Sequence, residues 1–177
     1  FDLYPEILVD LKILSENNFI IKICHFLQNK ALKKSKNIIV LSDNMFSRIN
    51  KKLPSIENKI IVIPTWEDTN KLYKIKKSEN KFIKNFNLED KFVVLYSGNQ
   101  GRCHDLKTIL KCAKYLKNKN EIVFIFVGNG FHNKKIRNFI SVENISNSLI
   151  LPYQEKKDLI YLLSAADVGL VSVIDEA

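Results

Sequence analysis

The segment YSGNQGRCHDL carries two of the chain's five glycines, Gly98 and Gly101, directly after an apolar run. Glycine lets the backbone turn tightly and come close to a ligand. A helix beginning near Asp105 would point its free N–H groups and the positive end of its dipole at the same place. Arg102 and His104 could add positive charge. The segment is compatible with a phosphate-binding turn, although a plain turn between a strand and a helix also explains it.

Polar or glycine-bearing segments follow three more apolar runs. They are Gly128-Asn129-Gly130, Pro152-Tyr153 and the residues from Ser172 to Glu176. Neither a P-loop nor the Gly-x-Gly-x-x-Gly dinucleotide fingerprint is present. We can assemble no Ser-His-Asp triad and no metal-binding set, and His25 is expected to be a packed or surface residue rather than a catalytic base. The pattern indicates at most a nucleotide-type ligand.

Alternating strands and helices must position these segments. Strands are expected over residues 92–96, 122–127, 149–151 and 168–173, with helices over residues 105–116, 132–140 and 155–166 between them. Upstream, helical periodicity runs over residues 8–34, strands are expected over residues 38–41 and 59–63, and a helix over residues 43–52. Such alternation predicts an α/β fold, with parallel sheets and helices on both faces. Ligands then bind outside the carboxyl ends of the strands.

A polar, Lys-rich stretch divides the chain. We expect one domain over residues 1–70, a linker over residues 71–80 and a second domain over residues 81–177. The sequence starts at Phe1, its only methionine is Met45, and its end follows directly on an apolar run. These features predict a fragment of a longer protein.

The net charge of +9 raises the question of an anionic partner. Almost all basic residues are lysines, and the only arginines are Arg48, Arg102 and Arg137. Because arginine is preferred for bidentate phosphate and base contacts, a nucleic-acid partner is disfavoured. A solvated lysine-rich surface is the favoured interpretation, and a basic face toward an anionic membrane stays open.

Three segments in order, VVLYSGNQGRCHDLKTILKCAKYL, IVFIFVGNG and LILPYQEKKDLIYLLSAADVGLVSV, resemble the donor-binding domain of family 4 glycosyltransferases. Upstream, DLYPE, NIIVLSDNM and KIIVIPTWED resemble the end of the acceptor-side domain. The similarity is closest to the branch that builds bacterial O-antigen, capsule and colanic-acid-type polysaccharides, and within it to fucosamine transferases. The family has the GT-B architecture, two Rossmann-like domains. The resemblance therefore implies a partial GT-B chain, with the C-terminal part of the acceptor-side domain followed by a truncated donor-binding domain.

The resemblance also implies roles for individual residues. Family members often have arginine at the position of Asn99 and lysine at that of His104, so we expect Arg102 to supply missing charge. Glu176 falls near the first acid of the Glu-x7-Glu motif that contacts the donor ribose and sugar. The donor diphosphate would meet Gly98, Asn99, Gly101, Arg102 and His104, and the nucleotide would meet Gly128, Asn129, Gly130, Pro152 and Tyr153.

The implied activity is transfer of a sugar from a UDP- or GDP-linked donor, with retention of configuration, in bacterial surface polysaccharide synthesis. The acceptor would be lipid-linked or another glycan, at the cytoplasmic face of the membrane. No cofactor or metal is implied, because positive side chains and helix N-termini stabilise the leaving diphosphate. The fragment is expected to be inactive alone.

Two alternatives stay open at this point. One is a nucleotide-sugar epimerase of the same architecture, which needs additional carboxylates in the cleft. The other is a non-enzymatic basic module that binds nucleic acid, whose affinity would fall steeply with salt.

Overall fold

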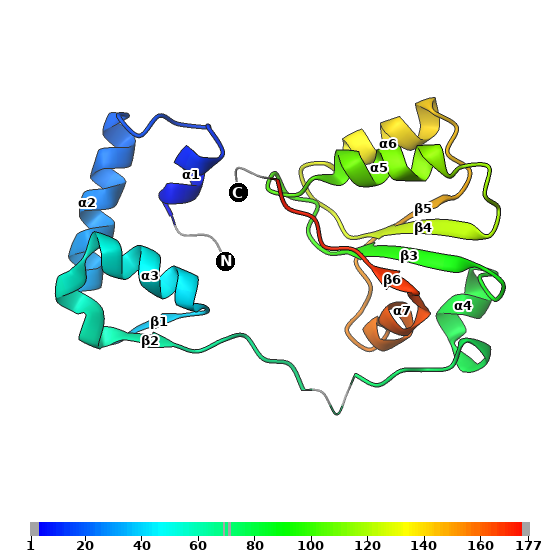
Figure 1. The fold of residues 1–177 in the computed structure, drawn as a ribbon, viewed down its shortest axis with the longest axis horizontal. Coiled ribbons are helices and arrows are strands. Elements are labelled where there is room, and N and C mark those ends of the chain that lie inside the picture. The colour runs from blue at the N-terminus through cyan, green and yellow to red at the C-terminus, as the bar shows by residue number, and fades with distance from the viewer. Residues whose placement is uncertain (1–3, 69, 71, 175–177) are drawn as a thin grey trace. The chain divides into compact units, whose positions relative to one another are not determined.

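The computed structural model describes residues 4–68, 70 and 72–174, which form two compact units (Figure 1). The described residues up to Glu67 form unit 1, and those from Asp68 onward form unit 2. Each unit has its own hydrophobic core.

Unit 1 holds a two-stranded parallel sheet. Strand β1 (Ile38–Val40) pairs with β2 (Ile60–Val62) in the register Ile38 to Ile60. Helix α3 (Asp43–Lys52) and a 3-10 helix (Pro54–Lys59) connect the two strands. The α3 helix starts as predicted, because Ser42 caps it by accepting a hydrogen bond from Met45 N–H at 3.3 Å. The core of unit 1 consists of Ile38, Val40, Ile49, Leu53, Ile56 and Ile60.

The helical periodicity predicted over residues 8–34 corresponds to two helices rather than one. The structure has α1 (Glu6–Asp10) and α2 (Phe19–Lys34) with a turn between them. Lys12 has a left-handed backbone (φ 55°), and the side chain of Asn18 caps α2 by accepting a hydrogen bond from Ile20 N–H. The apolar side chains that produced the helical periodicity are mostly exposed, since only Leu32 among them packs against the core.

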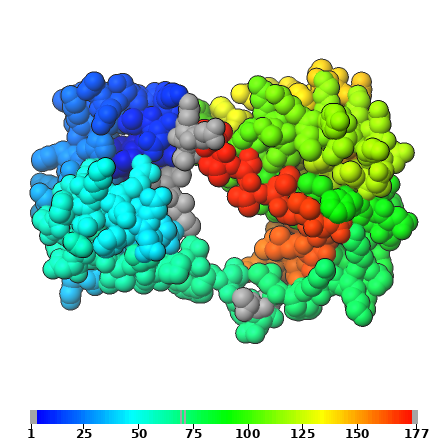
Figure 2. Space-filling model, viewed as in Figure 1, coloured from blue at the N-terminus to red at the C-terminus, as the bar shows by residue number. Residues whose placement is uncertain are grey.

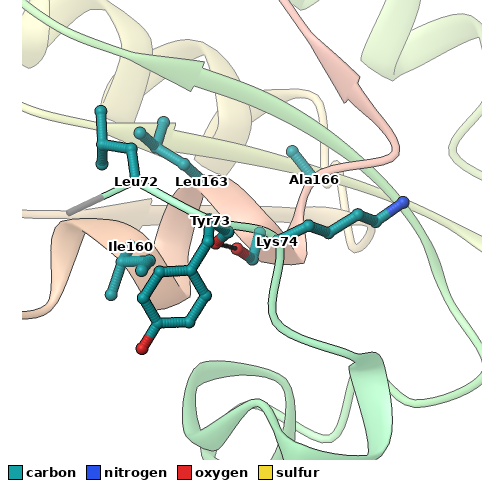
Figure 3. Close-up of a pocket in the computed structure, with 7 residues that line it drawn as sticks. Leu72, Tyr73, Lys74, Ile160, Leu163 and Ala166 are labelled. Carbon is teal, nitrogen blue, oxygen red and sulfur yellow. Dashed lines mark hydrogen bonds between the residues drawn. The ribbon is translucent and has the colours of Figure 1, made fainter. Parts of the chain in front are cut away.

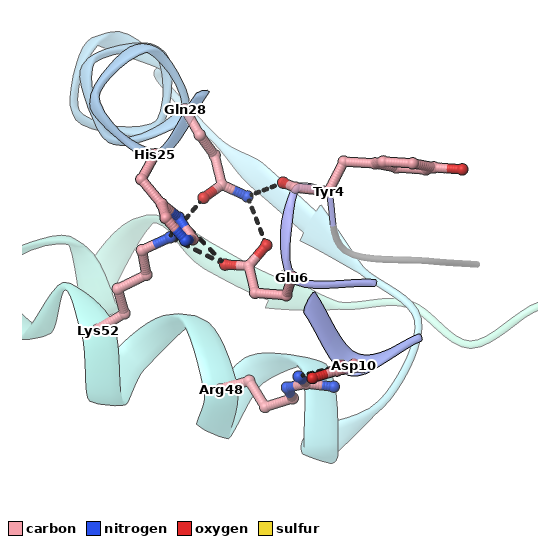
Figure 4. A network of polar contacts seen from close by, with 7 residues as sticks. All are labelled: Tyr4, Glu6, Asp10, His25, Gln28, Arg48 and Lys52. Carbon is pink, nitrogen blue, oxygen red and sulfur yellow. Dashed lines mark hydrogen bonds and ion pairs between the residues drawn. The ribbon is translucent and has the colours of Figure 1, made fainter. Parts of the chain in front are cut away.

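A polar network joins helices α1, α2 and α3 of unit 1 (Figure 4). Lys52 Nζ donates to Glu6 Oε1 at 2.8 Å and to Gln28 Oε1 at 2.6 Å, and it lies 2.7 Å from His25 Nδ1. Because an ammonium group only donates, Nδ1 of His25 must accept and the proton of the neutral ring must lie on Nε2. Burial raises the pKa of Glu6, but the hydrogen bond and charge of Lys52 outweigh it and lower the pKa below its ordinary value. His25 is therefore a packed residue with a structural contact.

Unit 2 holds a four-stranded parallel sheet in the order β5-β4-β3-β6. The strands are β3 (Phe92–Ser97), β4 (Ile122–Val127), β5 (Ser148–Leu151) and β6 (Val168–Gly169). Helices α5 (Leu106–Tyr115) and α6 (Asn133–Val142) cover one face, and α4 (Lys81–Asn85) and α7 (Leu159–Ala165) lie on the other (Figure 1). This arrangement agrees with the predicted α/β class.

Strand β4, IVFIFV, shows why the sheet is buried on both faces. Phe124 and Phe126 belong to the core under α5 and α6, whereas Val123, Ile125 and Val127 belong to the core under α4 and α7. Successive side chains of a strand point to opposite faces, so a continuous apolar run fits a sheet that is covered on both sides.

The segment expected to be a linker packs against unit 2. Residues 72–74 run along α7 and line a cavity of about 320 Å³ (Figure 3). Ser164 Oγ donates to Tyr73 O, and Ile75 N–H donates to Ser164 Oγ at 3.1 Å. Farther along, the fully buried Asn80 caps α4, a helix missed in the sequence, by accepting from Phe82 N–H.

Two predicted elements are shorter than expected. The helix predicted over residues 155–166 begins only at Leu159, because a turn closed by Asp158 N–H and Glu155 O precedes it. The strand predicted over residues 168–173 ends at Gly169, and Leu170 N–H makes the last hydrogen bond to Leu95 O.

Replacing Asp167 by asparagine should destabilise unit 2. Oδ2 of Asp167 accepts hydrogen bonds from Val93 N–H at 2.8 Å and from Lys77 Nζ at 2.9 Å, which ties β3 to the start of β6. Desolvation raises the pKa of Asp167, but the two hydrogen bonds and the charge of Lys77 together lower it by more. The folded pKa therefore lies below the ordinary value of 3.8. The stabilisation is therefore present above the unfolded pKa and lost as pH falls through the folded pKa. Denaturant unfolding should show a loss of about 1 kcal/mol near pH 7.

The difference in stability between this variant and the parent should shrink as pH falls below about 4, because Asp167 of the parent then binds a proton more readily in the unfolded chain than in the folded one. A difference that stays constant from pH 7 to pH 3 would contradict this role of the charge.

Candidate functional site

The order of the strands places a switch point between β3 and β6. From β3 the chain proceeds to β4 and β5 on one side, and then returns to pair β6 with the other edge of β3. In open α/β sheets, ligands bind in the crevice outside the carboxyl ends of strands at such a point. The β3–α5 loop, residues 98–105, and residues 170–174 after β6 lie on either side of it.

Hydrogen bonds hold these two segments together. Ile174 N–H donates to Cys103 O at 3.0 Å, and Ser172 Oγ donates to Asp105 O at 2.8 Å. Residues 170–174, in red in Figure 2, run along the surface of unit 2 with Val171 and Val173 exposed. Glu176, the predicted contact to the donor sugar, lies outside the described residues.

The predicted glycines bring the loops after β3 and β4 into backbone contact. A Cβ atom on Gly128 would lie 2.0 Å from Gly98 O, and one on Gly130 would lie 2.8 Å from Gln100 O. Both Gly128 (φ 127°) and Gly130 (φ 146°) have left-handed backbones that other residues rarely adopt. Hydrogen bonds then join the loops, from Gln100 N–H to Asn129 O and from His132 N–H to Gln100 O, both at 2.9 Å.

The segment after β5 joins the same group. Gly128 N–H donates to Leu151 O at 3.1 Å, and the hydroxyl of Tyr153 donates to Asn129 O at 3.3 Å. Pro152 and the Tyr153 ring are exposed. The structure thus brings the predicted residues of all three loops together at one edge of the sheet.

Gln100 is a residue of the site that the sequence analysis missed. Its side chain is fully buried, and its Oε1 accepts a hydrogen bond from Asn133 Nδ2 at 2.9 Å. Among the described residues, its Nε2 has no hydrogen-bond acceptor. Its position between two glycines in a loop is typical of an exposed residue, so no local signal predicted its burial.

His104 is held by a buried tyrosine. The Tyr96 hydroxyl donates to Asn99 O at 2.7 Å and lies 3.1 Å from His104 Nδ1. Burial raises the pKa of Tyr96, so the hydroxyl keeps its single proton at neutral pH. Since that proton goes to the carbonyl, Nδ1 of His104 must be the donor to the tyrosine oxygen. Nε2 is therefore the ring nitrogen that remains for a ligand.

Arg102 is exposed and lies over an aromatic ring of the neighbouring loop. Its Cζ atom is 4.0 Å from the centre of the Phe131 ring, which is a cation–π geometry. Next to it, burial lowers the pKa of His132, and the charge of Lys135 lowers it further. The edge of the sheet is thus electropositive around Arg102.

In the described part of the chain, no three His, Cys, Asp or Glu residues are grouped to hold a metal ion. No helix among these residues has both the length and the apolar character to cross a bilayer.

Replacing Gly128 by alanine should disrupt the contact between the loops. The added Cβ would collide with Gly98 O, and the backbone conformation would be strained, so we expect a loss of about 1–3 kcal/mol in unfolding free energy. Gly169→Ala is the matched control, because a Cβ there has no atom within 4 Å. Equal stability of the two variants in denaturant melts would contradict the loop contact.

Comparison with known proteins shows a family to which this chain is similar. The family described as "Glycosyl transferases group 1" matches residues 76–177. The Escherichia coli (strain K12) protein WcaI, described as a colanic acid biosynthesis glycosyl transferase, is 25% identical over 146 residues, which are 81% of this chain and 35% of WcaI. This chain therefore spans about a third of that curated relative.

Solved structures show the same fold. WaaG, a glycosyltransferase involved in lipopolysaccharide biosynthesis, matches with a TM-score of 0.71 and 14% identity over 98% of this chain and 48% of its own. Anabaena HepE in complex with UDP and glucose matches with a TM-score of 0.66 and 19% identity, over 89% of this chain and 42% of its own. These matches confirm the predicted Rossmann-like, partial GT-B fold. The chain belongs to the glycosyl transferases group 1 family.

Proposed function

We propose that this chain is part of a retaining glycosyltransferase that moves a sugar from a nucleotide diphosphate donor to a lipid-linked or glycan acceptor in bacterial surface polysaccharide synthesis. The observation that carries the proposal is the family match over unit 2, whose glycine-bearing loops meet at the switch point of the sheet. Relatives support the pathway, since WcaI is named for colanic acid and WaaG for lipopolysaccharide biosynthesis.

Unit 2 would bind the donor and unit 1 would belong to the acceptor-side domain. Gly98, Asn99 and Gly101 would approach the diphosphate with their backbone, and Arg102 and His104 would supply charge. Asn129 and Tyr153 would lie at the nucleotide, with Gly128, Gly130 and Pro152 shaping that part of the site. The neighbour HepE was solved with UDP and glucose, which supports a uridine nucleotide as a first probe.

Glycosyl transfer at this site would depend more on positive charge near the leaving diphosphate than on proton transfer. In glycosyl transfer, the bond between the anomeric carbon and the diphosphate breaks, and the diphosphate leaves with the electron pair. Cations and helix N-termini aimed at the developing charge stabilise that departure. Arg102 and the first turn of α5 could do this without a metal ion. The carboxylates in these loops already have protein partners, because Asp105 caps α5, Glu155 pairs with Lys157 and Asp158 pairs with Lys81, which favours transfer over the epimerase alternative.

The proposed location is the cytoplasm, with peripheral contact at the inner face of the membrane. A lipid-linked acceptor would be presented there, and the net charge of +9 would favour association with anionic lipids. Nucleic acid is not a proposed partner.

The donor-binding role can be tested on the 177-residue chain by calorimetry with UDP, GDP and UDP-glucose. At least one nucleotide should bind, and Arg102→Ala should weaken it about tenfold, or about 1.4 kcal/mol, because one cation is lost from the diphosphate. Lys111→Ala removes an exposed charge from α5 as the control. If the parent binds none of these nucleotides, the donor-binding proposal for this chain fails.

Stereochemistry should be tested on the full-length enzyme. The anomeric proton of the new product, observed by NMR before any mutarotation, should show the configuration of the donor sugar. A product of opposite configuration would contradict retention and leave the family membership untouched.

A further inference from the structure

A cavity of about 410 Å³ lies between the first turns of α5 and α6 in unit 2. Five basic side chains line it, those of Arg102, His104, Lys107, His132 and Lys135. Its remaining lining is mostly apolar, including Leu110 and Phe139, and Asp105 is the single acidic residue. Lys107, His132 and Lys135 were not among the residues expected to bind the donor.

Among the described residues that line this cavity, a single carboxylate, that of Asp105, faces the positive charge. Asp105 is engaged as the cap of α5, because its carboxylate accepts from Thr108 N–H and Thr108 Oγ1, and these bonds lower its pKa. Within the described residues, Arg102, Lys107 and Lys135 form no ion pair with a carboxylate. Arg102 and Lys135 instead share one aromatic ring, at 4.0 and 5.5 Å from the centre of Phe131.

The N-terminus of α6 adds hydrogen-bond donors. This helix has ten residues, and His132 at its N-cap position makes no side-chain capping bond. Among the described residues, the backbone N–H groups of Lys134 and Lys135 have no acceptor. Free N–H groups at the positive end of a helix dipole favour an anion, and one with several acceptor oxygens could satisfy several donors together.

We infer that this cavity binds a diphosphate group, held by Arg102, Lys107 and Lys135 and by the free N–H groups of α6. The inference rests on the proposed function, which assigns a nucleotide diphosphate to unit 2. It explains how a chain with asparagine at position 99 neutralises that group, because the cations come from the first turns of both helices. A lipid diphosphate carries the same group, so the test distinguishes the two sources.

The first experiment compares two double variants by calorimetry with UDP. Lys107→Ala/Lys135→Ala removes two cations of the cavity. Lys111→Ala/Arg137→Ala removes the same charge from the same two helices, at exposed positions that do not line the cavity. The cavity variant should bind UDP at least tenfold more weakly, whereas the control should stay within twofold of the parent. Circular dichroism melts confirm that both variants fold.

Further probes separate this inference from the proposed function. If the parent binds UDP and the cavity variant binds it equally well, the cavity inference is overturned and the donor assignment stands. If the parent binds inorganic pyrophosphate but neither UDP nor GDP, and the cavity variant loses it, the cavity stands and the donor assignment fails. Farnesyl diphosphate binding tighter than UDP, and lost in the cavity variant, supports the site with a lipid as its source. A parent that binds none of these probes overturns both.

An independent measurement follows the His132 ring by NMR. The groups around it are Arg102, His104 and Lys135, all basic. A diphosphate in the cavity would offset their charge, so saturating pyrophosphate should raise the pKa of His132. A purely structural role of these cations would leave it unchanged, and an unchanged value contradicts the inference.

Discussion

The close backbone approach of two glycine-bearing loops is the constraint on which the candidate site depends. Strands β3 and β4 pair in register to their last residues, Ser97 and Val127, so both loops leave the sheet at the same level. The ladder continues one step further, since Gly98 N–H donates to Val127 O. The missing side chain of Gly128 then leaves room for the Gly98 carbonyl. A side chain there would push the loops apart, and every later hydrogen bond between them depends on that spacing. Because backbone atoms make this contact, it does not require the side chains that point outward from the two loops. Those side chains remain available to a ligand.

The two units are stabilised in different ways. Unit 2 has an apolar core on each face of its sheet, so its elements are specified by burial on both sides. Unit 1 has a small core around Ile49 and Ile56, and its helices are joined instead by the polar group of Glu6, His25 and Lys52. In that group the lysine satisfies three acceptors, so removing it would leave a carboxylate with fewer partners than its burial requires. Several large apolar side chains of α2, Phe19 and Phe26 among them, stay exposed on the opposite face.

Most elements of unit 2 could be predicted because its strands are continuous apolar runs and its helices have clear amphipathic spacing. Strand β4 was predicted with its observed bounds, and Asp105 starts α5 as its spacing indicates. The periodicity over residues 8–34 predicted the helix Phe19–Lys34 but not the turn before it, because periodicity records where apolar residues recur and not whether the backbone turns between them, as it does at Lys12. The three loops could be placed at one edge by topology alone. Gln100, Lys107 and Lys135 could not be found, because their surroundings are created by contacts between segments far apart in the sequence. The roles of the predicted donor-binding residues stay predictions.

The position of Asn99 shows how packing and charge are linked in this site. A Cβ on Gly101 would lie 3.1 Å from Asn99 Nδ2, and one on Gly130 would lie 2.7 Å from Asn99 Oδ1, so the Asn99 side chain fills the space beside both glycines. An arginine at this position, as the resembling family often has, would have to leave that space and extend outward. Arg102 carries its charge from a point three residues later, where Phe131 of the other loop holds it. The short side chain of Asn99 and the position of the cation at Arg102 then both follow from the close approach of the two loops. Loops that close this tightly leave no room for a long side chain at their contact, so charge must be supplied from their rims and from the helices that follow.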